Sequence, residues 1–376
     1  MAERNLAKLI IYYVVLVCIL ILGALFYRTH NTLSKKVFLW LSFLLLFLLM
    51  AVRAETVGRD IHIYREKFQI IAAADTWKDI TETVENAPVY GLLCKLVSCF
   101  GDYRLMLIVT AFIITGSVAV YIYNFSDNAV ISVYCYVALF FYLHTYNISR
   151  QFLAIALFLL ALCLRNKRKY ILCAVCFLLA LGIHSLTAIA LPLLIINRER
   201  ITTKKFAVLM VATASAVLVF SVGLSQVVNH FAALFPRYNV YLGGGRHTYT
   251  DESSGSIVFL ALFYLLVAIM ALILQSNLIK GVHIKDEERS RLRWLIIVVT
   301  AGALMGIFSG KLEAMARVLY FYQIHAICLI PNAFGKFRRD RAYYPAYFIL
   351  MLILLVPFTI CLTKNFGEVV PYITMW

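Results

Sequence analysis

Charged side chains are scarce in this chain. Of its 376 residues only 14% are charged, whereas 63% are hydrophobic and the mean hydropathy is +0.86. A soluble domain of this length carries about a quarter charged residues. The apolar residues also form long uncharged runs such as VFLWLSFLLLFLLMAV and IVFLALFYLLVAIMALIL, and a run of about 18 residues spans a bilayer core. The sequence therefore predicts an all-α, polytopic integral membrane protein.

Several motifs of soluble enzymes and transporters are also missing. There is no P-loop, no G-x-G-x-x-G, no H-E-x-x-H and no acidic metal-binding pair on one helix face, so neither ATP hydrolysis nor a cofactor or metal is expected. The chain lacks internal repeats and the two matching halves with interrupted helices that mark an inverted-repeat transporter. It also has no large cytoplasmic domain where a nucleotide sugar could bind.

Cysteine gives no sign of a metal site. The nine cysteines fall almost entirely within apolar runs. Cys173 and Cys176 form a C-x-x-C without a second ligand pair, so we interpret them as small buried residues. Cys94 and Cys99 lie in a short segment expected to face outward, where the sequence leaves a disulfide open.

Lys and Arg between the apolar runs predict the orientation of the chain. About twelve spans are expected, near residues 8–27, 37–53, 105–123, 129–143, 151–164, 170–183, 186–196, 206–222, 256–275, 294–309, 317–334 and 345–362. One set of alternate loops holds 20 of the 35 Lys and Arg residues, namely 28–36, 124–128, 165–169, 197–205, 276–293 and 335–344. Because short basic loops stay in the cytoplasm, we expect both termini outside. The net charge of +16 then reflects the topology of the chain. Alternatively, the basic residues bind anionic lipid or a lipid-linked phosphate. Binding of nucleic acid is not expected.

The alternation of cytoplasmic and outer loops also divides the apolar residues 170–196 into two short spans. A single helix would put the basic stretches RNKRK and NRERITTKK on opposite faces of the membrane. A hairpin that turns at residues 182–185 keeps both inside, so we predict a hairpin.

The whole chain, residues 1–376, is expected to form one transmembrane domain with two large outer segments. Residues 53–104 are expected to contain an interfacial or re-entrant helix, because apolar residues from Leu92 to Phe100 recur at helical spacing opposite Lys95. Residues 223–255 contain three consecutive glycines, which suit a lid as well as a plain loop.

Ionisable residues at the outer ends of spans are functional candidates, because charge at membrane depth is costly. Arg150 opens a span behind Asn147 and Ser149, two good helix caps, and a guanidinium at a helix start suits a diphosphate. The alternative is an arginine that snorkels to the lipid headgroups. His184, at the predicted outer turn, is a candidate general base or a helix cap.

Two more outer positions carry charge. Asp60 follows the second span in VGRDIHIY and could bind sugar hydroxyls or act as a base, although a solvated loop acid is the commoner case. Glu313 and Arg317 are four residues apart, in the order that favours a structural ion pair. Alternatively, Arg317 binds phosphate and Glu313 positions it.

The order of these motifs resembles that of a known family. VGRDIHIYREKF is followed by PVYGLLCKLVSCFGDYR, NISRQFLAIALFLLALCL with RNKRKY, GIHSLTAIALPLL, PRYNVYL and ARVLYFY. This arrangement, over about residues 50–322, is similar to the EpsG/Wzy-type membrane polymerases of bacterial exopolysaccharides, capsules and O-antigens. Two motifs depart from the family pattern: Ile61 stands where an aromatic is usual, although Tyr64 is kept, and the turn reads HSLT.

The resemblance implies a metal-independent glycosyltransferase, similar to the inverting GT-C-like transferases, on the outer face of the bacterial inner membrane. A growing glycan would leave undecaprenyl diphosphate and pass to a sugar hydroxyl of an incoming lipid-linked unit. The residues expected at the site are Arg59, Arg150 and Arg317 for the diphosphate, His184 or Asp60 as base, and Tyr64, Glu313, Arg237 and Tyr238 for the substrate, with Arg237 and Tyr238 on the lid.

The expected partners are an undecaprenyl-diphosphate-linked oligosaccharide and membrane lipids, with a chain-length regulator and a flippase as protein candidates. Rival predictions are a flippase or exporter of lipid-linked glycans, an O-antigen ligase and an O-acyltransferase. A flippase should need charges along a path through the bilayer, whereas the charges here cluster at the outer ends of spans. An acyltransferase would need His184 on the cytoplasmic side.

Overall fold

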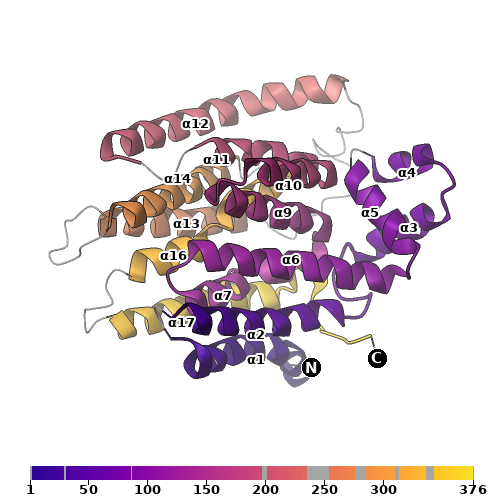
Figure 1. The fold of residues 1–376 in the computed structure, drawn as a ribbon, viewed down its shortest axis with the longest axis horizontal. Coiled ribbons are helices and arrows are strands. Elements are labelled where there is room, and N and C mark those ends of the chain that lie inside the picture. Colours follow the sequence, from indigo (N-terminus) through magenta and orange to yellow (C-terminus); the bar gives the residue numbers. More distant parts are fainter. Residues whose placement is uncertain are drawn as a thin grey trace. The chain divides into compact units, whose positions relative to one another are not determined.

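Helices make up most of the described residues in the computed structural model (Figure 1). The structure describes residues 2–28, 31–85, 87–196, 201–234, 254–275, 285–309, 313–335 and 343–375. Within these ranges there is no strand, and the one extended pairing is an isolated bridge between Arg53 and Thr374. The prediction of an all-α protein is confirmed.

The described residues form α-helices and short 3-10 helices in a fixed order along the chain. They are α1 (Ala2–Phe26), α2 (Thr32–Ala51), α3 (Ile61–Ala73), α4 (Trp77–Val84), α5 (Pro88–Ser98), α6 (Tyr103–Phe125), α7 (Ala129–Ala138), α8 (Phe141–Asn147), α9 (Ser149–Asn166), α10 (Tyr170–Ile183), η1 (Ser185–Ala190), α11 (Leu191–Ile195), α12 (Thr203–Leu234), α13 (Ser254–Gln275), α14 (Asp286–Ser309), α15 (Glu313–Gln323), α16 (Ala326–Phe334), α17 (Tyr343–Thr363) and η4 (Phe366–Glu368).

Six of the described helices are long and apolar enough to cross a membrane. They are Leu9–Phe26, Thr32–Ala51, Tyr103–Phe125, Ser149–Asn166, Asp286–Phe308 and Pro345–Thr363. The bent pair of α7 and α8, with 46° between the two helices, could form a seventh span. The protein is an integral membrane protein, and the count of about twelve spans stays a prediction.

Three expected boundaries differ from the structure. The span expected at 129–143 is broken near Phe140, whose φ of 68° is left-handed, and it continues to Asn147. Residues 223–234, which were expected to belong to an outer loop, are helical. Helix α12 continues to Leu234 because apolar residues recur there at helical spacing. The span expected at 294–309 begins earlier, at Asp286, because the charged start of α14 is also helical.

The chain divides into two compact units, Met1–Leu194 with Pro345–Trp376 and Ile195–Tyr344. In the first unit α9 is the core helix and packs against α6 and α10. Its Ala154, Ala156 and Ala161 are fully buried, and small residues allow helices to approach closely in a membrane. The single transmembrane domain over residues 1–376 stays a prediction.

In the second unit α14 packs against α12, α13, α15 and α16. A Cβ atom added at Gly306 would lie 2.7 Å from the Cβ of Ala261, and one at Gly302 would lie 2.9 Å from the Cβ of Tyr322. Glycine is therefore required where α13 and α15 approach α14. Arg293 donates to the carbonyl oxygen of Ile201 at 2.7 Å, which fixes the start of α12.

Three of the predicted basic loops meet at one end of the first unit. Lys35, in the first turn of α2, donates to the carbonyl oxygens of Tyr123 at 2.9 Å and Ser126 at 2.6 Å, at the C-terminal end of α6. The sulfur of Cys163, near the end of α9, lies 3.9 Å from the carbonyl oxygen of Val120. Loops 28–36, 124–128 and 165–169 therefore share an end, as the charge pattern predicts.

The expected break within residues 170–196 is confirmed. Helix α10 ends at Ile183, His184 is extended, and the chain continues as η1 and α11. The reversal of direction that would make a hairpin stays a prediction.

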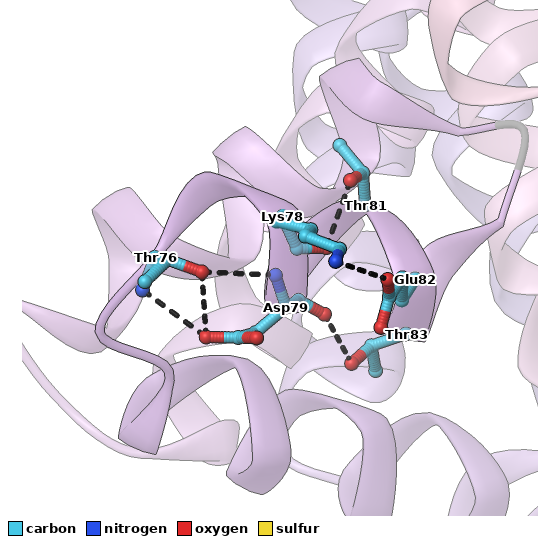
Figure 2. Close-up of polar contacts among 6 residues, drawn as sticks. All are labelled: Thr76, Lys78, Asp79, Thr81, Glu82 and Thr83. Carbon is cyan, nitrogen blue, oxygen red and sulfur yellow. Dashed lines mark hydrogen bonds and ion pairs between the residues drawn. The ribbon is translucent and has the colours of Figure 1, made fainter.

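The helices α3, α4 and α5 gather beyond the N-terminal end of α6 (Figure 1). A capping box between Thr76 and Asp79 begins α4 (Figure 2). The ammonium of Lys95 on α5 donates to the carbonyl oxygens of Ala72 at 3.0 Å and Ala74 at 2.8 Å, so it closes the end of α3. Lys95 thus joins two helices of the expected outer segment.

The helix expected near residues 92–100 exists as α5 and a short extension. Leu92, Leu96 and Phe100 are exposed, whereas Val97 is buried, so the apolar face is narrower than the sequence predicts. An interfacial position for α5 stays a prediction. All cysteines are free; Cys94 is buried and Cys99 is exposed, so these two do not form a disulfide.

Candidate functional site

The chain turns sharply after α2, at Gly58, Arg59 and Asp60. The N–H of Gly58 donates to the carbonyl oxygen of Glu368 at 3.0 Å, and that of Arg59 donates to the carbonyl oxygen of Gly367 at 2.9 Å. The N–H of Asp60 donates to the side-chain oxygen of Asn147 at 2.9 Å. The backbone N–H groups of three consecutive residues are thus bonded to two distant parts of the chain, residues 367–368 and Asn147.

Gly58 is required in this turn. Its φ is 117°, and a Cβ atom there would collide with the carbonyl oxygen of Tyr146. A side chain at this position would meet both a steric and a conformational penalty. The turn therefore lies directly against the end of α8.

The side chains of the turn carry opposite charges in different surroundings. The Nε of Arg59 lies 3.0 Å from a carboxylate oxygen of Glu368. Asp60 is only 9% exposed, so it is not the solvated loop acid that the sequence left as the commoner case. It precedes α3, but its side chain does not cap that helix.

Arg150 is the second residue of α9, and its guanidinium lies 5.9 Å from the centre of the Tyr90 ring. That distance permits a cation–π interaction. The expected capping by Asn147 and Ser149 is wrong, because Ile148 is the N-cap residue and makes no side-chain cap bond. The amide of Asn147 instead accepts from Asp60, which joins the starts of α3 and α9.

Two tyrosine side chains, Tyr90 and Tyr64, pack next to each other near Arg150. The ring of Tyr64 on α3 meets the Tyr90 ring edge-on, with 6.4 Å between centroids. Burial raises the pKa of the Tyr90 phenol well above its usual value, and burial raises the pKa of the Cys94 thiol to about 12. Both groups are therefore neutral at physiological pH.

His184 lies at the junction of α10 and η1. Its Nδ1 accepts from the N–H of Leu186 at 3.4 Å, and its carbonyl oxygen accepts from Thr187 at 2.7 Å, so it acts as a helix cap. A Cβ atom at Gly182 would collide with Val89, the neighbour of Tyr90. This end of α10 therefore packs on α5. A role for His184 as base, which would fall to Nε2, stays a prediction.

The sequence marks Arg53 only as one of several charged residues on the outer side and predicts no role for it. In the structure Arg53 is 1% exposed. Its guanidinium lies 4.6 Å from the Tyr146 ring centre, and it donates to the Met50 carbonyl oxygen at 2.9 Å. Burial lowers its pKa. The only available signal was an arginine directly after a long apolar run. A buried cation is retained where aromatic faces and carbonyls offset lost hydration, so Arg53 anchors the start of the outer segment.

The structure brings together Arg59, Asp60, Tyr64 and Arg150, with His184 on a neighbouring helix end. Arg317 is half-buried on α15, in the other unit. Glu313 begins α15, but its side chain lies outside the described part of the structure, as do Arg237 and Tyr238 altogether. Roles for these four residues stay predictions.

The fold is that of a polytopic helical membrane protein, and it gathers Arg59, Arg150, Tyr64 and Tyr90 at one end of the first unit. A family model describing the EpsG family matches residues 36–374, so the chain belongs to the EpsG family, a family of Wzy-type polysaccharide polymerases. It is a membrane polysaccharide polymerase, as the resemblance implies. No curated protein and no solved structure matches the chain significantly, and the likeness to GT-C transferases stays a prediction.

Replacing Gly58 by alanine should destabilise the protein by about 1–3 kcal/mol, because the backbone conformation and the Tyr146 carbonyl both reject a Cβ atom. Thermal unfolding of the purified protein in detergent measures the effect. Gly116→Ala is the control, because a Cβ atom there meets nothing within 4 Å. Equal unfolding temperatures for the two variants would show that the turn is not constrained as described.

Replacing Tyr90 by leucine should lower kcat/KM about two- to thirtyfold, because Arg150 loses an aromatic face that contributes about 0.5–2 kcal/mol. Tyr90→Phe keeps the ring and should retain most of the activity. Polymerisation by the purified variants measures the difference. Equal activity of the two would mean that the ring does not orient Arg150.

Proposed function

We propose that this chain polymerises oligosaccharide units carried on undecaprenyl diphosphate, at the outer face of the bacterial inner membrane. The pathway would be that of an exopolysaccharide, a capsule or an O-antigen. The observation that carries the proposal is the grouping of Arg59, Arg150 and buried Asp60 around Asn147, beside the ends of spans. A membrane-borne anion would reach such a site without leaving the bilayer surface.

The arginines suit a diphosphate leaving group. In the proposed reaction an acceptor hydroxyl oxygen attacks the anomeric carbon of the growing glycan, and the bond from that carbon to the diphosphate breaks. The electron pair leaves with the diphosphate oxygen. Arg59 and Arg150 would stabilise the charge that develops there, because fixed cations in a partly desolvated site act strongly on such charge. Arg317 is a further candidate for this role.

The proton of the acceptor hydroxyl needs a base. Asp60 is the stronger candidate, because it is buried and its backbone is bonded to Asn147, three residues before Arg150. His184 is second, because its Nδ1 is engaged in capping. The lengthened glycan stays on the incoming lipid, and undecaprenyl diphosphate is released. The proposed inverting reaction does not call for a metal.

The basic loops support the proposed orientation. Loops 28–36, 124–128 and 165–169 lie at the end of the first unit opposite the site, and short basic loops remain in the cytoplasm. The site would then face outward. Exposed Leu92, Leu96 and Phe100 on and after α5 would lie among lipid headgroups and chains.

Replacing Arg150 by alanine should abolish polymerisation of a synthetic lipid-linked unit by the purified protein. The expected loss is at least about a hundredfold, the usual consequence of removing a group that stabilises transition-state charge. Arg104→Ala is a matched control, because Arg104 is also the second residue of a spanning helix, α6, but is exposed. Full activity of Arg150→Ala would remove this residue from the site.

Native cysteines test the orientation. A membrane-impermeant maleimide should label exposed Cys99 in intact cells, whereas Cys94 is buried and burial raises its pKa to about 12. Cys99→Ser should therefore remove this labelling, and Cys94→Ser should not. Labelling of Cys99 only after permeabilisation would put the site on the cytoplasmic side.

A further inference from the structure

The C-terminal segment, residues 364–375, packs against the start of the outer segment. The N–H of Ala54 donates to the carbonyl oxygen of Ile373 at 2.8 Å, and that of Met375 donates to Val52 at 3.0 Å. The hydroxyl of Tyr372 donates to the carbonyl oxygen of Leu49 at 2.8 Å. These bonds tie the segment to residues more than 300 positions earlier.

The same segment supplies the partners of the Gly58 turn. Glu368 accepts from the N–H of Gly58 through its carbonyl oxygen and from Nε of Arg59 through its carboxylate. Gly367 accepts from the N–H of Arg59. One residue, Glu368, therefore engages both the backbone of the turn and its charged side chain.

The backbone around Glu368 is unusual. Asn365, Gly367 and Glu368 have φ values of 51°, 73° and 54°, and left-handed conformations are unfavourable for residues other than glycine. The amide of Asn365 exchanges two bonds with Val370, at 2.9 and 2.8 Å, which stabilises the turn. Such conformations persist where the surrounding structure imposes them, often at functional sites.

We infer that Glu368 is a positioning residue of the polymerase, which orients the guanidinium of Arg59 toward the substrate diphosphate. This inference rests on the proposed role of Arg59. The carboxylate restricts rotation of the guanidinium about its long side chain, and a restricted side chain loses less entropy when it binds an anion. The C-terminal segment is then part of the site, although it follows the last span.

The ion pair contributes little to folding. The Arg59 and Glu368 side chains are 21% and 56% exposed, and ion pairs at such exposed positions contribute little to stability. Removal of the carboxylate should therefore raise the KM for the substrate while leaving the unfolding temperature nearly unchanged. This difference separates positioning from a purely structural role.

The test is the kinetics of Glu368→Gln in the full-length protein, reconstituted with a synthetic undecaprenyl-diphosphate-linked unit. The KM for the unit should rise about two- to tenfold, with kcat within about twofold and the unfolding temperature unchanged. Glu368→Asp, which keeps the charge, should recover part of the loss. The control is Glu82→Gln, which removes an exposed carboxylate 3.8 Å from Lys78 (Figure 2) and should change neither value.

A double-mutant cycle distinguishes failure of this inference from failure of the proposed function. If Glu368 acts through Arg59, Glu368→Gln should add nothing in an Arg59→Ala background. Unchanged KM in Glu368→Gln would overturn the positioning role even if Arg59→Ala is inactive. Where Arg59→Ala keeps measurable activity, an equal effect of Glu368→Gln in both backgrounds would also overturn it. A fully active Arg59→Ala protein would instead remove Arg59 from diphosphate binding.

Discussion

Backbone hydrogen bonding around residues 58–60 is the constraint on which the rest of the first unit depends. Groups that leave a helix at the membrane surface must find partners in the protein or in water. Here the N–H groups of Gly58 and Arg59 bond to residues 368 and 367, and that of Asp60 bonds to Asn147. The ends of α2, α8 and α17 are thereby joined at one point.

The helices outside the spans extend this connection to the remaining candidate residues. Lys95 ties α5 to the end of α3, Tyr90 of α5 lies under Arg150, and Val89 contacts Gly182 near His184. A charged substrate group would thus meet side chains from several helices that are held relative to one another. Such support is needed where fixed charges stabilise a leaving group, because misplaced charges lose most of their effect.

Much of this architecture could be predicted from the sequence because it reflects local patterns. Apolar runs predict the helices, and the Lys and Arg distribution groups loops 28–36, 124–128 and 165–169 at one end. The break at His184 follows from the same rule, because it keeps the basic loops on both sides of residues 170–196 at one face of the membrane. The α7–α8 bend and the helical course of residues 223–234 were missed, because neighbouring charge and glycine content alone do not determine where an apolar helix stops.

The contacts that build the site could not be predicted, because they join distant residues. Asn147 is a plausible cap for the helix that follows it, and only tertiary structure shows that it accepts from Asp60 instead. Arg53 is buried against the ring of Tyr146 on α8, which lies far from it in the sequence. Glu368 has no motif of its own. Only the structure shows that Glu368 bonds to Gly58 and Arg59.

The measurement that tests the central claim most directly is the stoichiometry of the reaction in proteoliposomes. The purified protein would be given a synthetic undecaprenyl-diphosphate-linked unit, and both new glycosidic bonds and released undecaprenyl diphosphate would be counted. The account predicts one released lipid diphosphate for each bond formed, with products of increasing length. Passage of the unit across the bilayer without bond formation would contradict it.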